Sequence, residues 1–197
     1  DDNPAEREIV RSQLNISAPE ISSPEDYIRI FDRNGFFEPT SISKDDISRN
    51  EMYKANAERT RFAARFESYS DYLLSLNMTA EIEPFSSVYL PRITQLTNKS
   101  NQFNLTTKRY TQNEIEEISR NRGYIHLYGR LEDKFGDNGV VSVIIGKIEG
   151  GDLHIDLWLM SCRVLKRDME YAMLDSLVEK CREKNIKNIY GYCLLYT

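Results

Sequence analysis

The stretch Gly123–Leu165 reads GYIHLYGRLEDKFGDNGVVSVIIGKIEGGDLHIDLWLMSCRVL and carries three strand patterns in succession. Alternating or continuous apolar residues are separated by two turn signals, Asp137–Gly139 and Glu149–Asp152. Consecutive strands that are joined by short turns pair antiparallel. We therefore predict three neighbouring antiparallel strands, the last of which spans 153–165.

The flanking sequence predicts a mixed fold. A strand is expected at 78–84, followed by a helix near 87–100 and a second helix that begins at the capping box Thr111–Glu114. After the three strands, a helix at 168–184 leads to a strand at 186–193, and such a crossover joins parallel strands. The order β-α-α-β-β-β-α-β predicts the α+β class, with a mixed, mainly antiparallel sheet flanked by helices.

The composition excludes several classes of protein. A formal net charge of −5 argues against a general nucleic-acid binder. No apolar run approaches the ~18 residues that a membrane-spanning helix needs, and we expect no signal peptide. Cys162, Cys181 and Cys193 lack the spacing of a metal site or of a disulfide framework, so we expect a reducing, cytoplasmic compartment.

Four stretches resemble the C-terminal half of FkbH-like proteins. They are DDNPAERE (1–8), LPRITQLTNKSNQFNLTTKRYT (90–111), RLEDKFGDNGVVSV (130–143) and DLWLMSCRVLKRDMEYAML (156–174). These proteins join a haloacid dehalogenase-like (HAD) phosphatase domain of subfamily IIIC to a GNAT-like acyltransferase domain. In this family the HAD domain is associated with moving a glyceryl group onto an acyl carrier protein.

The resemblance implies a division of the chain into three parts. Residues 1–21 correspond to the C-terminal stub of the HAD-like domain, and 22–77 to a helical linker region. An apolar stripe along 52–66 favours packing of this linker on the sheet. Residues 78–197 correspond to a GNAT-like domain whose C-terminal end is expected to be missing, so that the chain is a piece of a longer protein.

The HAD-like part is not expected to act as a phosphatase here. Asp1 and Asp2 resemble the last HAD motif, whose carboxylates help to hold Mg²⁺ in an intact domain. The nucleophile motif of that family, DxDx[TV], does not occur in the chain. The resemblance therefore implies Mg²⁺ only for an intact HAD domain.

A loop before the helix at 168–184 is the expected donor site. GNAT enzymes carry R/Q-x-x-G-x-G/A here, and backbone amides at the helix N-terminus bind the pyrophosphate of coenzyme A. The resemblance implies that coenzyme A or a phosphopantetheine thioester binds at Arg163, Val164, Leu165, Lys166 and Arg167. Lys166 and Asp168 stand where glycines are expected, so an ordinary strand-to-helix turn is the alternative.

Strand alternation suggests a catalytic acid. It places Leu153, Ile155, Leu157 and Leu159 on one face, and His154, Asp156, Trp158, Met160 and Cys162 on the other. A buried acid beside a tryptophan has a raised pKa and can serve as a general base, which makes Asp156 the candidate. Cys162, beside Arg163 and a helix N-terminus, is a candidate acyl-carrying nucleophile. The alternatives are a structural aspartate and a buried, unreactive thiol.

The polar stretch QLTNKSNQFNLTTKRY, residues 95–110, lies where GNAT proteins grip the acceptor. The predicted substrate-binding residues are Asn101, Phe103, Asn104, Lys108, Arg109 and Trp158. The amides can donate and accept hydrogen bonds, and the two adjacent cations can meet a phosphate or an acidic carrier protein. The alternative is a self-bonded loop that braces the sheet.

Two functions remain open from the sequence. The first is an acyltransferase that transfers or receives an acyl group, such as a glyceryl group, from a thioester of coenzyme A or an acyl carrier protein. The second is a non-catalytic module that docks a carrier protein or a substrate for the HAD domain. An unpaired strand edge at the incomplete C-terminal end also predicts a homodimer. No nucleic-acid or membrane partner is expected.

Overall fold

The computed structural model describes residues 3–14, 16–36, 47, 49–99, 103–104 and 106–192. It forms two compact units, Asp1–Ile47 and Ser48–Thr197. The first unit contains α1 (Pro4–Leu14) and α2 (Asp26–Arg33), with Ile21 buried and Arg7 paired to Glu20 at 3.6 Å. The predicted boundaries at 21/22 and 77/78 stay a prediction, and Asp1 and Asp2 lie outside the described residues.

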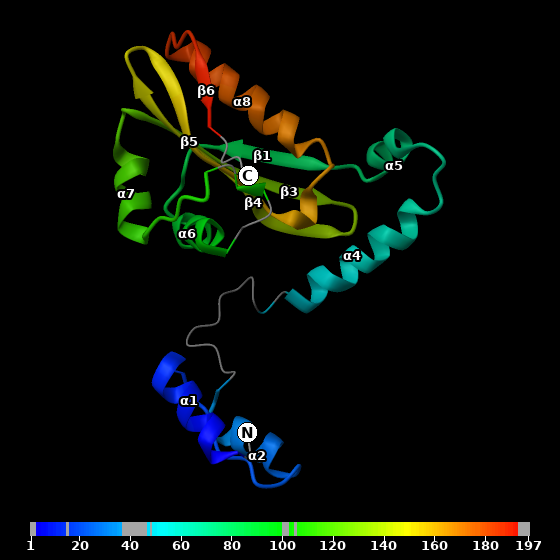
Figure 1. Cartoon of the computed structure of the whole chain (residues 1–197). Helices are drawn as coiled ribbons and strands as arrows, with labels where there is room; N and C mark the ends of the chain where they lie inside the picture. The colour runs from blue at the N-terminus through cyan, green and yellow to red at the C-terminus, as the bar shows by residue number, and fades with distance from the viewer. Residues whose placement is uncertain are drawn as a thin grey trace. The chain divides into compact units, whose positions relative to one another are not determined.

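The second unit contains the sheet (Figure 1). Its helices are α4 (Arg49–Ala63), α5 (Tyr69–Ser75), α6 (Leu90–Lys99), α7 (Gln112–Arg120) and α8 (Met169–Glu183), with a 3₁₀ turn at Cys162–Val164. Its strands are β1 (Thr79–Glu83), β2 (Phe103–Asn104), β3 (Tyr124–Asp133), β4 (Gly136–Glu149), β5 (Asp152–Met160) and β6 (Ile189–Gly191). Strands β1, β3, β4 and β5 pair antiparallel in that order, and β5 also pairs with β2 antiparallel and with β6 parallel. The predicted α+β class is confirmed.

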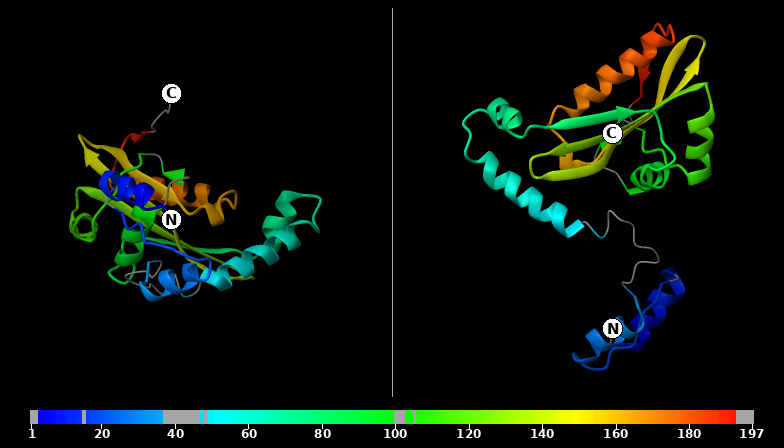
Figure 2. Two further views of the ribbon diagram at one scale, coloured as in Figure 1. Left: turned by 60° about the horizontal axis from the view of Figure 1, so that its bottom comes forward. Right: turned by 180° about the vertical axis from the view of Figure 1, so that it is seen from behind.

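Helices cover both faces of this sheet (Figures 1 and 2). On one face, Met173 and Leu177 of α8 pack with Ile144 of β4. On the other face, Ile93 of α6 and Ile115 of α7 belong to a second apolar cluster. The predicted capping box starts α7, because the Thr111 side chain accepts from the Glu114 amide while the Glu114 carboxylate accepts from the Thr111 amide at 2.7 Å. Among the described residues, no helix is both long and apolar enough to span a membrane.

A bulge in β5 changes which side chains share a face of the sheet, so the predicted assignment of residues 153–162 to two faces is wrong. Ile145 pairs with Leu157 and Gly146 with Ile155, so Asp156 has no partner residue in β4. One extra residue in a strand reverses which side chains face which side of the sheet. The structure accordingly divides the apolar residues that were expected on one face: Leu153 and Ile155 pack under α8, and Leu157 and Leu159 pack in the cluster under α6 and α7.

The end of β5 also differs from the prediction. The strand was expected to reach residue 165, but it ends at Met160 and a 3₁₀ turn begins at Cys162. The Ser161 amide still donates to the Val141 carbonyl at 2.7 Å, and the Val164 amide then donates to the Ser161 carbonyl at 3.1 Å. The chain thus turns away from the sheet one residue after the last paired position.

The segment Asp137–Gly139 is part of β4 and not the hairpin turn that its Asn-Gly pair predicted. The turn lies at Lys134–Phe135, where the Asp133 carboxylate accepts from the Phe135 amide at 2.8 Å. Gly139, at φ +67°, accompanies a shift of the β3–β4 register, and positive φ at glycine is typical of a bulge. The second predicted turn is confirmed at Gly150–Gly151.

Helix α4 packs beside the β3–β4 hairpin, as the apolar stripe at 52–66 predicted. The Phe62 ring contacts the Phe135 ring edge to face, with 5.6 Å between centroids. The Lys134 ammonium lies 3.2 Å from the centre of the Phe62 ring, a cation–π contact. These contacts place α4 against the end of the sheet that also carries the loop before α8.

Candidate functional site

The outer edge of β5 changes its partner halfway along the strand. Strand β6 pairs with Leu153–Ile155, and β2 pairs with Leu159–Met160. Among the described residues, Asp156–Trp158 has no strand partner on this edge. The bulge therefore lies in an opening between β6 and β2, where no described strand pairs with this edge of β5.

Asp156 is the centre of this opening. Its carboxylate Oδ1 accepts from the Lys108 ammonium at 2.6 Å, and its backbone carbonyl accepts from the Thr106 hydroxyl at 2.6 Å. The Asp156 side chain is 25% exposed and that of Lys108 is 50% exposed. The acid is therefore not buried as the sequence predicted, but the structure does bring the candidate base together with one predicted substrate-binding residue.

Sequence reasoning missed Tyr110, which lies at the same site. Burial of its half-buried phenol, followed by the charge of Asp156, raises the Tyr110 pKa above its ordinary value, so the hydroxyl stays protonated. The Asn98 side chain holds the segment by donating to the Tyr110 carbonyl at 2.9 Å. No local pattern distinguishes this residue among the 12 tyrosines of the chain. Its position depends on folding of the segment 106–110 against β5.

Trp158 carries an unsatisfied donor at the other end of the opening. Its ring contacts Phe103 of β2 edge to face, with 6.0 Å between centroids. The indole N–H is buried and has no hydrogen-bond partner among the described residues. A buried donor without an acceptor costs about 1–3 kcal/mol, so a ligand carbonyl at this position would be stabilised.

The other predicted substrate-binding residues bond within their own loop. The Asn104 side chain accepts from the Thr107 amide at 3.0 Å, and the Arg109 guanidinium donates to the Thr97 carbonyl of α6. Asn101 lies outside the described residues. Both the ligand-binding and the bracing interpretations of 95–110 thus have support, because Lys108 is half-exposed and paired with Asp156, whereas Arg109 is bonded to α6.

Beyond Asp156 on the β6 side, His154 belongs to an aromatic cluster. Its ring stacks on Tyr190 with 5.0 Å between centroids and on Tyr192 with 6.0 Å. Its Nδ1 lies 2.7 Å from the Tyr192 hydroxyl. The cluster forms a partly exposed aromatic surface next to the opening in β5.

The loop before α8 has a glycine-type backbone without glycines. Lys166 adopts φ +64° and Asp168 φ +59°, at the two positions where the resemblance places glycine. The Lys166 amide donates to the Glu170 carboxylate at 3.0 Å, and the Tyr69 hydroxyl donates to the Lys166 carbonyl. The side chain of Glu170 therefore occupies a backbone donor that a phosphate would need.

The structure does not gather the five predicted donor-binding side chains into one pocket. Val164 is buried in the core, and Leu165 packs against the same cluster. Arg163 donates to the Ser161 hydroxyl at 3.3 Å and also contacts the Met52 sulfur of α4. Lys166 is exposed.

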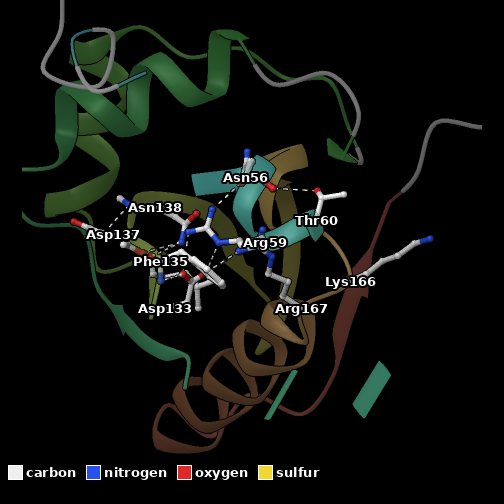
Figure 3. A network of polar contacts seen from close by, with 12 residues as sticks. Asn56, Arg59, Thr60, Asp133, Phe135, Asp137, Asn138, Lys166 and Arg167 are labelled. Atoms are coloured by element: carbon white, nitrogen blue, oxygen red, sulfur yellow. Dashed lines mark hydrogen bonds and ion pairs between the residues drawn. The ribbon is translucent and has the colours of Figure 1, made fainter. Parts of the chain in front are cut away.

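Arg167, the fifth of these side chains, points inward to a buried ion-pair network. Figure 3 shows Arg59 of α4 and Arg167 of the loop converging on Asp133 of β3. Arg59 binds the Asp133 carboxylate through two nitrogens at 2.7 and 2.9 Å, and Arg167 binds it at 3.0 Å. Burial, together with the nearby Arg59, lowers the pKa of Arg167. This network holds α4, the hairpin and the loop together.

Cys162, the second catalytic candidate, is exposed and carries a free thiol in the 3₁₀ turn. It is thus not the buried thiol of the alternative interpretation. It lies beyond the end of β5, outside the strand on which Asp156 and Trp158 are placed.

We expect Lys166→Gly to be more stable than Lys166→Ala by about 1 kcal/mol, because a left-handed backbone costs a residue with a Cβ roughly 1–2 kcal/mol and glycine nothing. Urea denaturation of the two variants measures the difference. Equal stabilities would show that the loop relaxes from its positive φ once the lysine side chain is removed.

The comparisons with known proteins concern the fold. No protein-family model and no curated protein sequence matches this chain. Similar solved structures include the ribosomal-protein-S18-alanine N-acetyltransferase from Escherichia coli, with 9% identity, a TM-score of 0.44, and coverage of 57% of this chain and 66% of that one.

Two further structures show the same level of similarity. AAC(6')-Iy, in complex with the bisubstrate analogue CoA-S-monomethyl-acetylneamine, has 8% identity and a TM-score of 0.47, covering 59% of this chain and 80% of its own. A GNAT family acetyltransferase from Staphylococcus aureus has 13% identity and a TM-score of 0.43, covering 61% and 91%. At these values the likeness is one of strand and helix arrangement and says nothing about activity.

Proposed function

We propose that the second unit is the GNAT-like acyltransferase domain of an FkbH-like protein, which transfers an acyl group from a thioester to an amine. One observation carries this proposal: on the edge of β5 between β6 and β2, the Asp156 carboxylate, which is paired with the Lys108 ammonium, lies two residues from the unsatisfied indole N–H of Trp158. An extended thioester arm can pair with this edge as a short strand would.

The donor is proposed to be a phosphopantetheine thioester on an acyl carrier protein in preference to free coenzyme A. Coenzyme A carries a pyrophosphate that requires free loop amides at a helix N-terminus. Here the Lys166 amide is bonded to Glu170, and Arg167 is bonded to Asp133. The Trp158 N–H is suited to a carbonyl of the pantetheine arm, which both donors share.

The acceptor is proposed to replace the ammonium of Lys108 at Asp156. An ion pair between partly exposed groups contributes only about 0–1 kcal/mol, so an acceptor ammonium can displace Lys108 at little cost. Asp156 then takes one proton from that ammonium, and the free amine attacks the thioester carbonyl. A C–N bond forms, the C–S bond breaks, and the departing thiolate takes up the proton that the attacking nitrogen loses. Tyr110, which stays protonated, is a hydrogen-bond donor at this site.

A docking module is the second candidate function. The absence of loop glycines and the internal use of Glu170, Arg163 and Arg167 favour it. Under this alternative the carrier protein or the substrate binds the same edge, but the chemistry is done by an HAD domain with its own Mg²⁺. We also propose that residues 1–21 belong to that HAD domain. A homodimer through the strand edge and a cytoplasmic location are proposed for the chain as well.

Calorimetric titration with coenzyme A, acetyl-coenzyme A and a phosphopantetheinylated carrier protein tests the proposal. We expect the carrier protein to bind and coenzyme A to bind weakly. Trp158→Phe should weaken carrier binding by about tenfold, since it removes one hydrogen bond and keeps the ring. Binding without acyl transfer to any amine would favour the docking module, and failure of all three ligands to bind would reject both functions.

A further inference from the structure

A second groove lies at the start of β3, away from the opening in β5. Strand β1 ends where Glu83 pairs with Tyr128, so residues 124–127 have no β1 partner on the sheet edge. A cavity of about 220 Å³ opens over these residues. It is bounded by the C-terminal ends of α7 and α8 and by Pro84, which follows β1.

The lining of this groove is strongly basic. Arg120, Arg122, Lys180 and Lys184 line it, and no carboxylate of a described residue does. Arg120 pairs with Glu116 at 3.6 Å and Lys180 with Glu183 at 3.0 Å. Arg122 and Lys184 form no ion pair with any described residue. In a chain with a net charge of −5, the groove thus carries a local excess of positive charge, which comes from Arg122 and Lys184.

Helix dipoles account for only part of the pattern. Cations near a helix C-terminus are stabilised by the carbonyl end of the dipole, which explains Arg120 at the end of α7 and Lys180 and Lys184 at the end of α8. It does not explain Arg122, which follows the end of α7 and begins the turn into β3. Nor does it explain why both helix ends flank one hollow.

The groove also contains a neutral histidine. His126 accepts from the Phe85 amide through Nδ1 at 3.0 Å. Burial lowers the His126 pKa below its ordinary value, and the charge of Lys184 contributes to the same shift. His126 is therefore a neutral polar residue in the lining of the groove at neutral pH. Its pKa depends in part on the charge of Lys184.

We propose that this groove binds a phosphate-bearing ligand. A phosphate dianion is suited to several converging cations, and guanidinium groups bind its oxygens in pairs. The ligand is either a free phosphoester or a phosphorylated lipid headgroup, which present the same chemistry. The site is separate from the proposed donor site, because the 15 residues of α8 at ~1.5 Å each put its two ends about 20 Å apart.

The test uses the two histidines of the chain, His126 and His154, as internal probes. Glycerol 3-phosphate is titrated into the full chain while histidine ring signals are followed by NMR, and vesicles with phosphatidic acid are tested in parallel. We expect saturable shifts at His126 and a higher His126 pKa, since bound phosphate offsets the charge of Lys184. His154, in its aromatic cluster, should not respond.

A double variant and its charge-matched control decide the outcome. Arg122→Ala with Lys184→Ala should weaken phosphate binding by about tenfold or more, as expected for lost charge-assisted bonds. Arg182→Ala with Lys187→Ala removes the same charge from exposed positions at the same end of the chain, outside the groove, and should leave binding unchanged. Equal losses in both variants, or no response at His126 to either glycerol 3-phosphate or the phosphatidic acid vesicles, would overturn the proposal. Binding to vesicles alone would assign the phosphate to a lipid headgroup.

Discussion

Replacing Asp133 with asparagine is expected to destabilise the second unit by about 3–5 kcal/mol, the usual cost of removing one partner from a buried ion pair. The Asp133 side chain is fully buried, and Arg59 and Arg167 are 4% and 10% exposed. Without the carboxylate, two guanidinium groups remain close together in a poorly hydrated position. These guanidinium groups keep their protons, and they cannot reach water unless α4 or the loop before α8 moves.

Asp137→Asn is the matched control for this prediction. Asp137 lies on the same hairpin and pairs with Arg130 at 2.6 Å, but both side chains are more than a third exposed. Exposed pairs contribute about 0–1 kcal/mol, so this variant should lose little stability. Urea denaturation followed by the fluorescence of the single tryptophan, Trp158, measures both. A similar small loss in the two variants would mean that the network around Asp133 is hydrated.

The triple replacement Arg59→Met, Asp133→Leu and Arg167→Met extends the experiment. A buried network that is exchanged for apolar groups of similar size is often neutral in stability. We expect this variant to recover most of the stability lost by Asp133→Asn. Failure to recover it would show that the hydrogen bond that the Phe135 amide donates to the Asp133 carboxylate, at 2.8 Å, matters more than the charges.

Asp156→Asn is expected to lower acyl transfer by about 10²–10⁴-fold, the range in which a positioned general base contributes. The asparagine keeps the size of the side chain and leaves the backbone bond from Thr106 in place, so the bulge should persist. Stability should therefore change little while turnover falls. Initial rates with a carrier-protein thioester and a panel of amines measure the effect.

Asp152→Asn provides the control on the same strand. Asp152 accepts from the Asn188 side chain at 2.9 Å and lies near the β4–β5 turn, away from the opening. It should transfer acyl groups at the rate of the unchanged protein. Undiminished activity of Asp156→Asn would assign Asp156 a structural role only, bonded to Lys108.

Lys108→Gln separates binding of the acceptor from chemistry. If the acceptor ammonium replaces that of Lys108, removing the lysine eliminates a competitor for the Asp156 carboxylate. We expect a lower KM for the acceptor with kcat changed less than KM. A fall in kcat with KM unchanged would instead show that Lys108 takes part in the chemical step.

Much of the fold follows from signals that act over a few residues. The capping box at Thr111 and Glu114 starts α7, and the glycine pair at 150–151 turns β4 into β5. Alternating apolar residues place the strands, because a strand exposes successive side chains to opposite faces. These signals need no distant partner, which is why the α+β class could be predicted from them.

The candidate site depends on contacts between distant parts of the chain. Lys108 and Asp156 are 48 residues apart, and Arg59 and Asp133 are 74 apart, so no local pattern relates them. The bulge at Asp156 arises from the register between β4 and β5, and it changed which leucines share a face.

The sequence by itself determined the order of the helices and of all the strands of the sheet except β2, which was not predicted. Only the tertiary structure decided that Asp156 is a partly exposed, ion-paired carboxylate and that Lys166 and Asp168 take a backbone conformation usually left to glycine. The physical reason is that local propensity acts over a few residues, whereas register, burial and ion pairing are set by the partners that the folded chain brings together.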